Sequence, residues 1–420
     1  MTSAETAPPD NRAASDNRAA PAPRKRLRGL LSSYRELLAV PGVPRMLVAS
    51  VTSKLPLTMV SLALLLYVGP RYSYAVAGLA VAAMGVGQGL SAPVRGRLID
   101  RHAYRPIVLG TMTGYLAAFS ALVAAVRSHG PVPLVLVLAA LGGVTVPPVG
   151  IMMRTLWREV GGQRQLVTAM ALDSAMSDIA QISGPALAAW LTLSVSGIVA
   201  FALCGVLTVV AVVLVLSLPA VQLPQRRTGG GHWAGPLRSA ALRRLLLVHA
   251  AFSAMITGVD VVISVLNADR HTAMYTGIDI GALSVGSIVG SLALGAVPGL
   301  LARGPKLAVL LGTFAAGVAV LAAASRLPPL AMLLACPIAG VSYGSTFGVL
   351  FTTGGDLAPE GSATETQAWL SSLTQGGTAA GAAAAGYFAA GSHSLAVLCA
   401  VSLLAVLAAG FTWNVRADAV

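Results

Sequence analysis

Three ionisable side chains lie deep inside long apolar segments of the sequence. Lys54, Asp178 and Asp260 each stand well within a run that is otherwise almost uncharged. Because a charged side chain at bilayer depth costs several kcal/mol or more, such residues usually bind a charged solute or move a proton. The alternative is a structural ion pair. These three side chains are therefore the first candidates for chemistry.

Lys54 and Asp178 lie at similar depths in their segments. With about 1.5 Å of rise per helical residue, Lys54 is roughly 13 Å and Asp178 roughly 18 Å from the same side. Such a pair could be salt-bridged when the site is empty and could separate when Asp178 takes up a proton or a cationic solute. Asp178 also belongs to a polar stripe with helical spacing, formed with Ser174, Gln181 and Pro185. We predict a coupling or substrate cavity lined by Lys54, Asp178, Gln181 and Asp260.

The composition requires a lipid environment for the segments that carry these residues. The chain is 56% hydrophobic and only 10% charged, with a mean hydropathy of +0.78, whereas a soluble domain carries roughly 25% charged residues. A helix needs about 20 apolar residues to span a membrane. The sequence predicts an all-α polytopic membrane protein whose twelve spans lie near residues 45–68, 75–96, 106–126, 132–153, 166–192, 197–218, 244–266, 276–301, 307–325, 328–352, 365–390 and 394–414.

The apolar segments fall into two groups of six, separated by polar sequence. Residues 1–44 are polar and rich in Pro and Ala, and they predict a disordered basic tail. A second polar stretch, which contains Gly229-Gly230-Gly231, predicts a linker at 219–243. The expected domains are therefore a six-helix bundle over 45–218 and another over 244–415.

The distribution of basic residues predicts the orientation in the membrane. Arginine and lysine favour cytoplasmic loops, and one set of alternate connections is much richer in them than the other. The rich set holds Arg24–Arg45, Arg95, Arg97, Arg101, Arg105, Arg154, Arg158, Arg164, Arg226, Arg227, Arg238, Arg243, Arg244, Arg303, Lys306 and Arg416, whereas the other holds Arg71, Arg127, Arg270 and Arg326. Both termini are expected in the cytoplasm, and His249 is expected at the membrane interface.

The net charge of +13 would otherwise suggest nucleic-acid binding. The basic residues, however, lie in short clusters between apolar runs without interleaved aromatic residues, which is typical of contacts to anionic lipid headgroups. We therefore expect membrane lipids and no nucleic acid as partners. The arginine-rich and alanine-rich composition favours a bacterial origin and hence the inner, cytoplasmic membrane.

The two halves repeat each other in sequence. Residues 143–190 align without gaps to residues 340–387, so that Glu159 matches Asp356, Ala171 matches Ala368, Ser174 matches Ser371 and Gly184 matches Gly381. Parallel six-helix repeats are a transporter architecture in which the substrate site lies between the halves near the midplane.

A charged motif follows the second apolar segment. It reads Gly96-Arg97-Leu98-Ile99-Asp100-Arg101-His102-Ala103-Tyr104-Arg105, with glycine, acid and bases at fixed spacing. This motif, in this loop of a duplicated twelve-span chain, resembles the loop motif of the major facilitator superfamily, although Ala103 stands where the family usually has glycine. The resemblance covers about residues 45–415. It implies a conformational latch formed by Gly96, Asp100, Arg101 and Arg105, which joins the halves on the cytoplasmic side and stabilises the outward-facing state.

The fifth apolar segment carries a second motif. Gly184-Pro185, within Ala180–Ala189, resembles the family's antiporter motif, with alanines in place of the other glycines. Small residues and proline suit a bending helix packed at the interface of the halves. This motif favours export and a likeness to the bacterial drug-exporter branch. The fourth segment has Leu138 and Ala139 where proton-coupled drug exporters carry an arginine, which argues against standard drug/proton antiport.

Together these features imply a secondary active transporter that works by alternating access. Efflux of a drug-like or secondary-metabolite compound is the favoured function, with protons as the candidate coupling ion; uptake, lipid translocation and a non-transporting scaffold remain alternatives. No phosphate-binding loop, catalytic motif or metal-ligand spacing is present in the sequence. We therefore expect a monomer that is not an enzyme and that needs no cofactor or metal.

Overall fold

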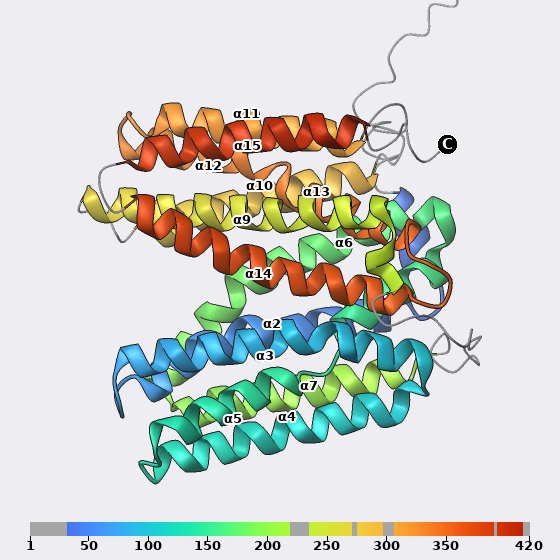
Figure 1. Ribbon diagram of the computed structural model, residues 1–420, viewed down its shortest axis with the longest axis vertical. Coiled ribbons are helices and arrows are strands. Elements are labelled where there is room, and N and C mark those ends of the chain that lie inside the picture. The colour runs from blue at the N-terminus through green and yellow to red at the C-terminus, as the bar shows by residue number, and fades with distance from the viewer. Residues whose placement is uncertain (1–31, 219–234, 271–274, 297–305, 390–392, 415–420) are drawn as a thin grey trace, which may run out of the picture.

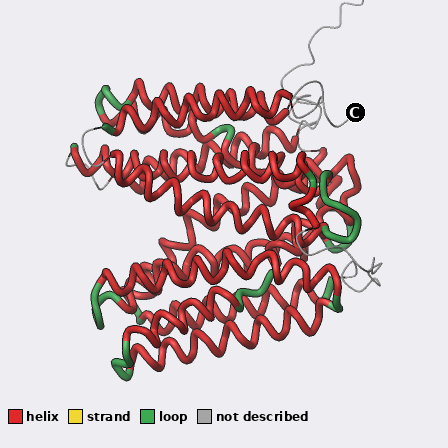
Figure 2. Tube along the Cα trace, in the orientation of Figure 1, coloured by secondary structure: helices red, strands yellow, loops and turns green. Residues whose placement is uncertain are grey.

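The computed structural model describes residues 32–218, 235–270, 275–296, 306–389 and 393–414 (Figure 1). This part of the chain is almost entirely helical and contains no strand (Figure 2). The all-α expectation is confirmed.

The first group of helices, here called the N-half, holds α2 to α7. Their bounds are α2 Val43–Val68, α3 Tyr74–Arg101, α4 Tyr104–Arg127, α5 Val132–Val144, α6 Val149–Ser194 and α7 Gly197–Leu216. The second group, the C-half, opens with a short 3-10 helix, Gly235–Arg238. Its helices are α9 Ala240–Asp269, α10 Thr276–Ala296, α11 Lys306–Ala324, α12 Pro329–Gly340, α13 Tyr343–Asp356, α14 Ala363–Ala389 and α15 Ser394–Asn414.

Ten helical stretches among the described residues are long and apolar enough to cross a membrane. The other two predicted spans, the fifth and the eleventh, lie in the later part of α6 and in α14. They are rich in Ser, Thr, Gln and Gly, which lowers their hydropathy. In Figure 1 both helices lie between the two groups, where α6 contacts α10 and α14 contacts α3.

Two predicted spans are broken rather than continuous. The fourth is divided between α5 and the start of α6, because Pro147 and Pro148 lack the N–H groups that would continue the helix. The guanidinium of Arg95, which the sequence placed among cytoplasmic charges, is buried and donates to the Val146 carbonyl in this break. The tenth span is also divided, between α12 and α13, although Val341 and Ser342 rather than prolines lie in that break.

Equivalent glycines pack in equivalent ways in the two halves. A Cβ on Gly184 would lie 2.0 Å from the Thr58 hydroxyl of α2, and a Cβ on Gly381 would lie 2.2 Å from the Ala254 carbonyl of α9. Each of these glycines therefore lets α6 or α14 approach the first helix of its own half. The expected pseudo-symmetry of the two bundles is thus visible in the packing.

The expected disordered tail is shorter than the sequence suggested. Residues 32–38 are helical, Leu37 is fully buried and Tyr34 is partly buried, so the prediction of disorder over 32–44 is wrong. The physical reason is that this short helix packs its apolar side against the N-half core. Residues 1–31 and most of the expected linker (219–234) lie outside the described residues, and α9 already begins at Ala240 within the expected linker.

Candidate functional site

The two halves meet along two helix pairs. α3 packs against α14, and α6 packs against α10 (Figure 1). We call the end of the bundle where α3 passes into α4, on the right in Figure 1, the Asp100 end. At this end two glycines allow close approach: a Cβ on Gly96 would lie 2.6 Å from the Ala368 Cβ, and a Cβ on Gly295 would lie 2.5 Å from the Ala171 Cβ. The two contacts are related by the internal repeat.

Asp100 lies directly at the first turn of α14. Its Oδ1 accepts a hydrogen bond from the Thr364 N–H (3.1 Å), and its Oδ2 accepts one from the Glu365 N–H (2.7 Å). The first N–H groups of a helix have no partner within the helix and carry partial positive charge. A carboxylate at this place therefore holds the halves together through charge-assisted hydrogen bonds.

The bases of the same motif are placed differently. Arg97 and Arg101 interact electrostatically with Glu365 of α14. Arg105 is exposed at the start of α4 and makes no hydrogen bond or ion pair with a described residue. The structure thus brings Gly96, Asp100 and Arg101 together against α14 and leaves Arg105 outside this contact.

Further contacts between the halves reinforce the Asp100 end. Arg158 forms an ion pair with Asp356 at 2.6 Å, and the Thr168 hydroxyl donates to the Gly295 carbonyl at 2.7 Å. The Tyr34 hydroxyl donates to the Leu292 carbonyl at 2.7 Å, and burial raises its pKa to about 12, so it stays a neutral donor. Among the described residues, hydrogen bonds between the halves occur from this end to the middle of the bundle. The structure is therefore closed at the Asp100 end.

A buried ion pair lies deeper in the N-half. The Lys54 amine is 2.6 Å from Asp173 Oδ1 and also donates to the Asp173 carbonyl oxygen, while the Ser50 hydroxyl donates to Oδ1 at 2.8 Å. Arg154 adds a second cation, with its Nε 3.8 Å from Asp173 Oδ2. Lys54 is therefore paired with Asp173, and the expected salt bridge to Asp178 is wrong.

Helix geometry explains why the sequence pointed to the wrong aspartate. Asp173 and Asp178 are five residues apart, which places them roughly 140° apart around α6. Ser50 and Thr58 of α2 bond to Asp173 and to the Ala180 carbonyl, so the Asp173 face of α6 is the one that faces α2. A similar depth along two helices does not say which face of a helix a neighbour contacts.

Asp178 instead faces the C-half. Its Oδ2 accepts a 2.6 Å hydrogen bond from the Ser287 hydroxyl of α10. The Ser287 oxygen in turn accepts a 2.9 Å hydrogen bond from the Gly344 N–H, in the first turn of α13. This arrangement directs the Ser287 hydroxyl proton toward Asp178 and connects the carboxylate to the break between α12 and α13.

Comparisons with known proteins identify the family of this chain. The family model described as Major Facilitator Superfamily matches residues 46–382. The chain belongs to the Major Facilitator Superfamily. A search of curated proteins finds no match.

Solved structures show the same superfamily fold. A bacterial homologue of the iron transporter ferroportin in the outward-facing state is 16% identical, with a TM-score of 0.73, and covers 89% of this chain and 98% of that one. A human organic anion transporter is 17% identical with a TM-score of 0.70, and the match covers 88% of this chain and 98% of that one. The E. coli fucose:proton symporter is 13% identical with a TM-score of 0.69, and the match again covers 88% of this chain and 98% of that one. Family and fold identify a multi-pass membrane transporter that handles a small molecule, and not an enzyme.

Two residues near the Lys54–Asp173 ion pair were not identified from the sequence as site residues. Arg154, counted from sequence as a cytoplasmic charge, lies over the Phe351 ring at 3.5 Å and donates to the Ser371 hydroxyl of α14. His249, expected at the interface, is fully buried with its Nε2 2.7 Å from the Thr374 hydroxyl. The alignment of Arg154 with Phe351 in the repeat was a signal that it lies on an inward face.

Other predicted residues do not join this cluster. Gln181 is exposed. Asp260 lies in α9 near Tyr343 and Cys336, and its carboxylate accepts no hydrogen bond from a described residue. Gly184 packs on α2 of its own half rather than between the halves, because its face of α6 points toward Thr58. Within the described part no group of three His, Cys, Asp or Glu side chains could hold a metal ion.

The Lys54–Asp173 pair should matter for stability. Asp173→Asn should destabilise the transporter by about 3–5 kcal/mol, because it leaves buried cations without their counter-charge. Replacing both partners, Lys54→Met with Asp173→Leu, should recover part of this loss. Reversible unfolding of the purified protein in detergent measures both effects. A single variant as stable as the wild type would contradict the buried pairing.

Proposed function

We propose that this transporter exports a drug-like or secondary-metabolite compound across the cytoplasmic membrane in exchange for protons. The Asp100 end faces the cytoplasm, and the conformation described above is the outward-facing one. The observation that carries the proposal is the Asp178–Ser287 hydrogen bond, since it places a titratable group on a contact that must break when the transporter opens to the cytoplasm.

The proposed orientation makes a topology prediction. Because the basic residues favour one side, reporters fused after Arg227 should report a cytoplasmic location and reporters fused after Arg270 an external one. Alkaline phosphatase and green fluorescent protein fusions give opposite signals on the two sides. An external signal from the segment after Arg227 would refute the orientation.

Protonation supplies a physical link between the gradient and the conformational change. An ionised Asp178 accepts a strong charge-assisted hydrogen bond from Ser287, whereas a protonated one does not. A proton that enters from the open side therefore weakens the α6–α10 contact and favours opening of the Asp100 end. Release of that proton to the cytoplasm restores the contact, which gives the sequence of events needed for proton-driven export.

The buried ion pair supports a division of roles. Lys54 is held by Asp173, so Asp178 lies near Lys54 but has no ion-pair partner among the described residues. A cationic or polar substrate near Asp178 would compete with the proton for the same carboxylate. The latch contacts of Gly96, Asp100 and Arg101 stabilise the outward-facing state, in which substrate is released and a proton is bound on the outer side.

Export is supported by the likeness of Gly184-Pro185 to the antiporter motif. The second candidate function is proton-coupled uptake of an organic anion. It is favoured by the fact that two cations, Lys54 and Arg154, share the single carboxylate of Asp173. The solved relatives handle iron, organic anions and fucose, so the fold alone does not choose between these candidates.

A deletion strain tests export directly. Loss of the gene should make the host more sensitive to at least one toxic compound in a broad panel, and a wild-type copy should restore resistance. An Asp178→Asn copy that is present in the membrane should not. Unchanged sensitivity to the panel, together with reduced accumulation of a labelled organic anion, would contradict export and favour the uptake candidate.

A further inference from the structure

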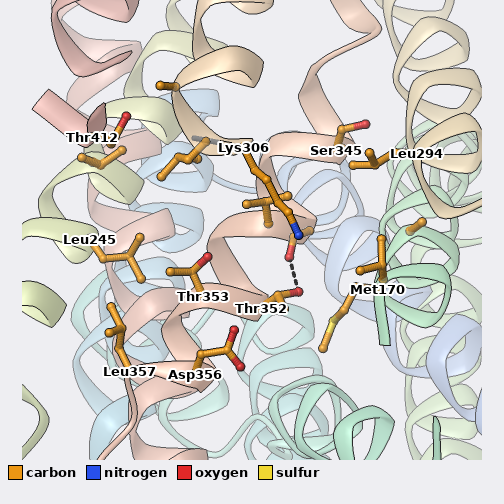
Figure 3. A pocket seen from close by; sticks show the side chains of 18 of the residues that line it. Met170, Leu245, Leu294, Lys306, Ser345, Thr352, Thr353, Asp356, Leu357 and Thr412 are labelled. Carbon is orange, nitrogen blue, oxygen red and sulfur yellow. Dashed lines mark hydrogen bonds between the residues drawn. The ribbon is translucent and has the colours of Figure 1, made fainter. Parts of the chain in front are cut away.

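A cavity of about 300 Å³ lies between the halves at the Asp100 end (Figure 3). One wall is formed by Val167, Met170 and Ala171 of α6, in the N-half. The remaining walls come from α9, α10, α11, α13 and α15 of the C-half. Neither Lys54 nor Asp178 lines it, so this cavity is distinct from the ion pair and the coupling residue.

The lining of the cavity is amphipathic. Met170, Leu245 and Leu294 give it an apolar body, and Lys306, Thr352 and Asp356 add polar groups (Figure 3). In Figure 3 the amine of Lys306 reaches into the space near Thr352. Such a combination of apolar walls with a few convergent polar groups is typical of a small-molecule site.

The charges around the cavity leave a positive surplus. Asp356 is the acid of the lining, and Arg158 balances it at 2.6 Å from outside the cavity. Lys306 is half-buried and forms no ion pair or hydrogen bond with a described residue. A half-buried ammonium without a counter-charge favours an anionic partner.

We propose that this cavity binds a small amphipathic anion from the cytoplasm: a carboxylate with a short acyl or aromatic body. A volume of 300 Å³ equals about ten water molecules at about 30 Å³ each, which excludes a whole phospholipid. Because α6 supplies one wall and the C-half the others, opening of the Asp100 end takes the site apart. A bound anion therefore stabilises the closed Asp100 end and slows the transport cycle. The site goes beyond the proposed transport function and does not depend on the identity of the substrate.

Binding of sodium octanoate to the purified full-length transporter tests the proposal by calorimetry. Octanoate should bind to the wild type, and Lys306→Gln should weaken its binding by roughly tenfold to a hundredfold, since a hydrogen bond to a charged group is lost. Arg326→Gln, which removes an exposed charge after the far end of α11, should leave the affinity unchanged. Octanol has the apolar body without the charge, and inorganic phosphate has the charge without the apolar body. Both should bind at least tenfold more weakly than octanoate.

Two further variants locate the bound anion. Thr353→Phe places a large side chain in the lining and should abolish octanoate binding, whereas Asp178→Asn should retain it. Octanoate should also increase the fraction of wild-type molecules in which labels at His102 and Glu360, on opposite halves at the Asp100 end, are close together. The proposal is overturned if folded Lys306→Gln binds octanoate as tightly as the wild type does. It is also overturned if octanol or phosphate binds as tightly as octanoate, or if Asp178→Asn loses octanoate binding.

Discussion

Asp178→Asn should abolish gradient-driven accumulation of substrate while sparing exchange of substrate across the membrane. Asparagine keeps the size of the side chain and can still accept a hydrogen bond from Ser287, but it cannot bind and release a proton. If Asp178 carries the coupling proton, the variant transporter can change conformation with substrate bound and cannot use the proton gradient.

Two transport assays in proteoliposomes separate these outcomes. With a pH gradient, the wild type should concentrate its substrate and Asp178→Asn should not; without a gradient, exchange of labelled for unlabelled substrate should proceed at a similar rate in both. Asp269→Asn, an exposed acid at the end of α9, serves as the control. If Asp178→Asn still concentrates substrate with an unchanged pH dependence, Asp178 is structural, and Asp260 is the next residue to test.

Gly96→Leu should strongly reduce transport while the protein remains in the membrane. A Cβ at this position would already lie 2.6 Å from the Ala368 Cβ and 2.8 Å from the Thr364 carbonyl oxygen, so a leucine must push α3 and α14 apart. Asp100→Asn acts on the same contact: losing charge from two hydrogen bonds should weaken it by about 2 kcal/mol. That loss shifts the equilibrium between two states roughly thirtyfold toward opening of the Asp100 end.

The chain offers a matched control for the glycine variant. Gly110 lies on α4, away from the α3–α14 contact, and a Cβ there would meet nothing within 4 Å. Gly110→Leu should therefore transport like the wild type. Normal transport by Gly96→Leu and Asp100→Asn at wild-type expression would show that the contact is not part of the transport cycle.

Much of the fold could be predicted from the sequence because hydropathy and the internal repeat report it directly. Uninterrupted apolar runs predicted most helix positions, and the motif around Asp100 predicted a contact between the two halves. The breaks at Pro147-Pro148 and after Gly340 were missed, since proline and glycine inside an apolar run are also compatible with a continuous, kinked helix.

The candidate site was less predictable than the fold. Sequence gives the depth of Lys54 and Asp178 but not the rotation of α2 and α6 about their axes, so the pairing with Asp173 could not be found. The sequence did not identify Arg154 as a site residue because it lies beside other arginines near an expected loop. There, a role in setting the orientation in the membrane explains a basic residue equally well. Its contact with Phe351 depends on the packing of α13 from the other half.

The central claim is that this transporter alternates between a state closed at the Asp100 end and a state closed at the opposite end. Distances between spin labels test it without knowledge of the substrate. One pair, at the exposed positions His102 and Glu360, reports on the Asp100 end, and another, at Tyr74 and Phe388, reports on the opposite end. Gly96→Leu should lengthen the first distance and shorten the second relative to the wild type. Two distances that stay unchanged, or that change in the same direction, would contradict alternating access in this chain.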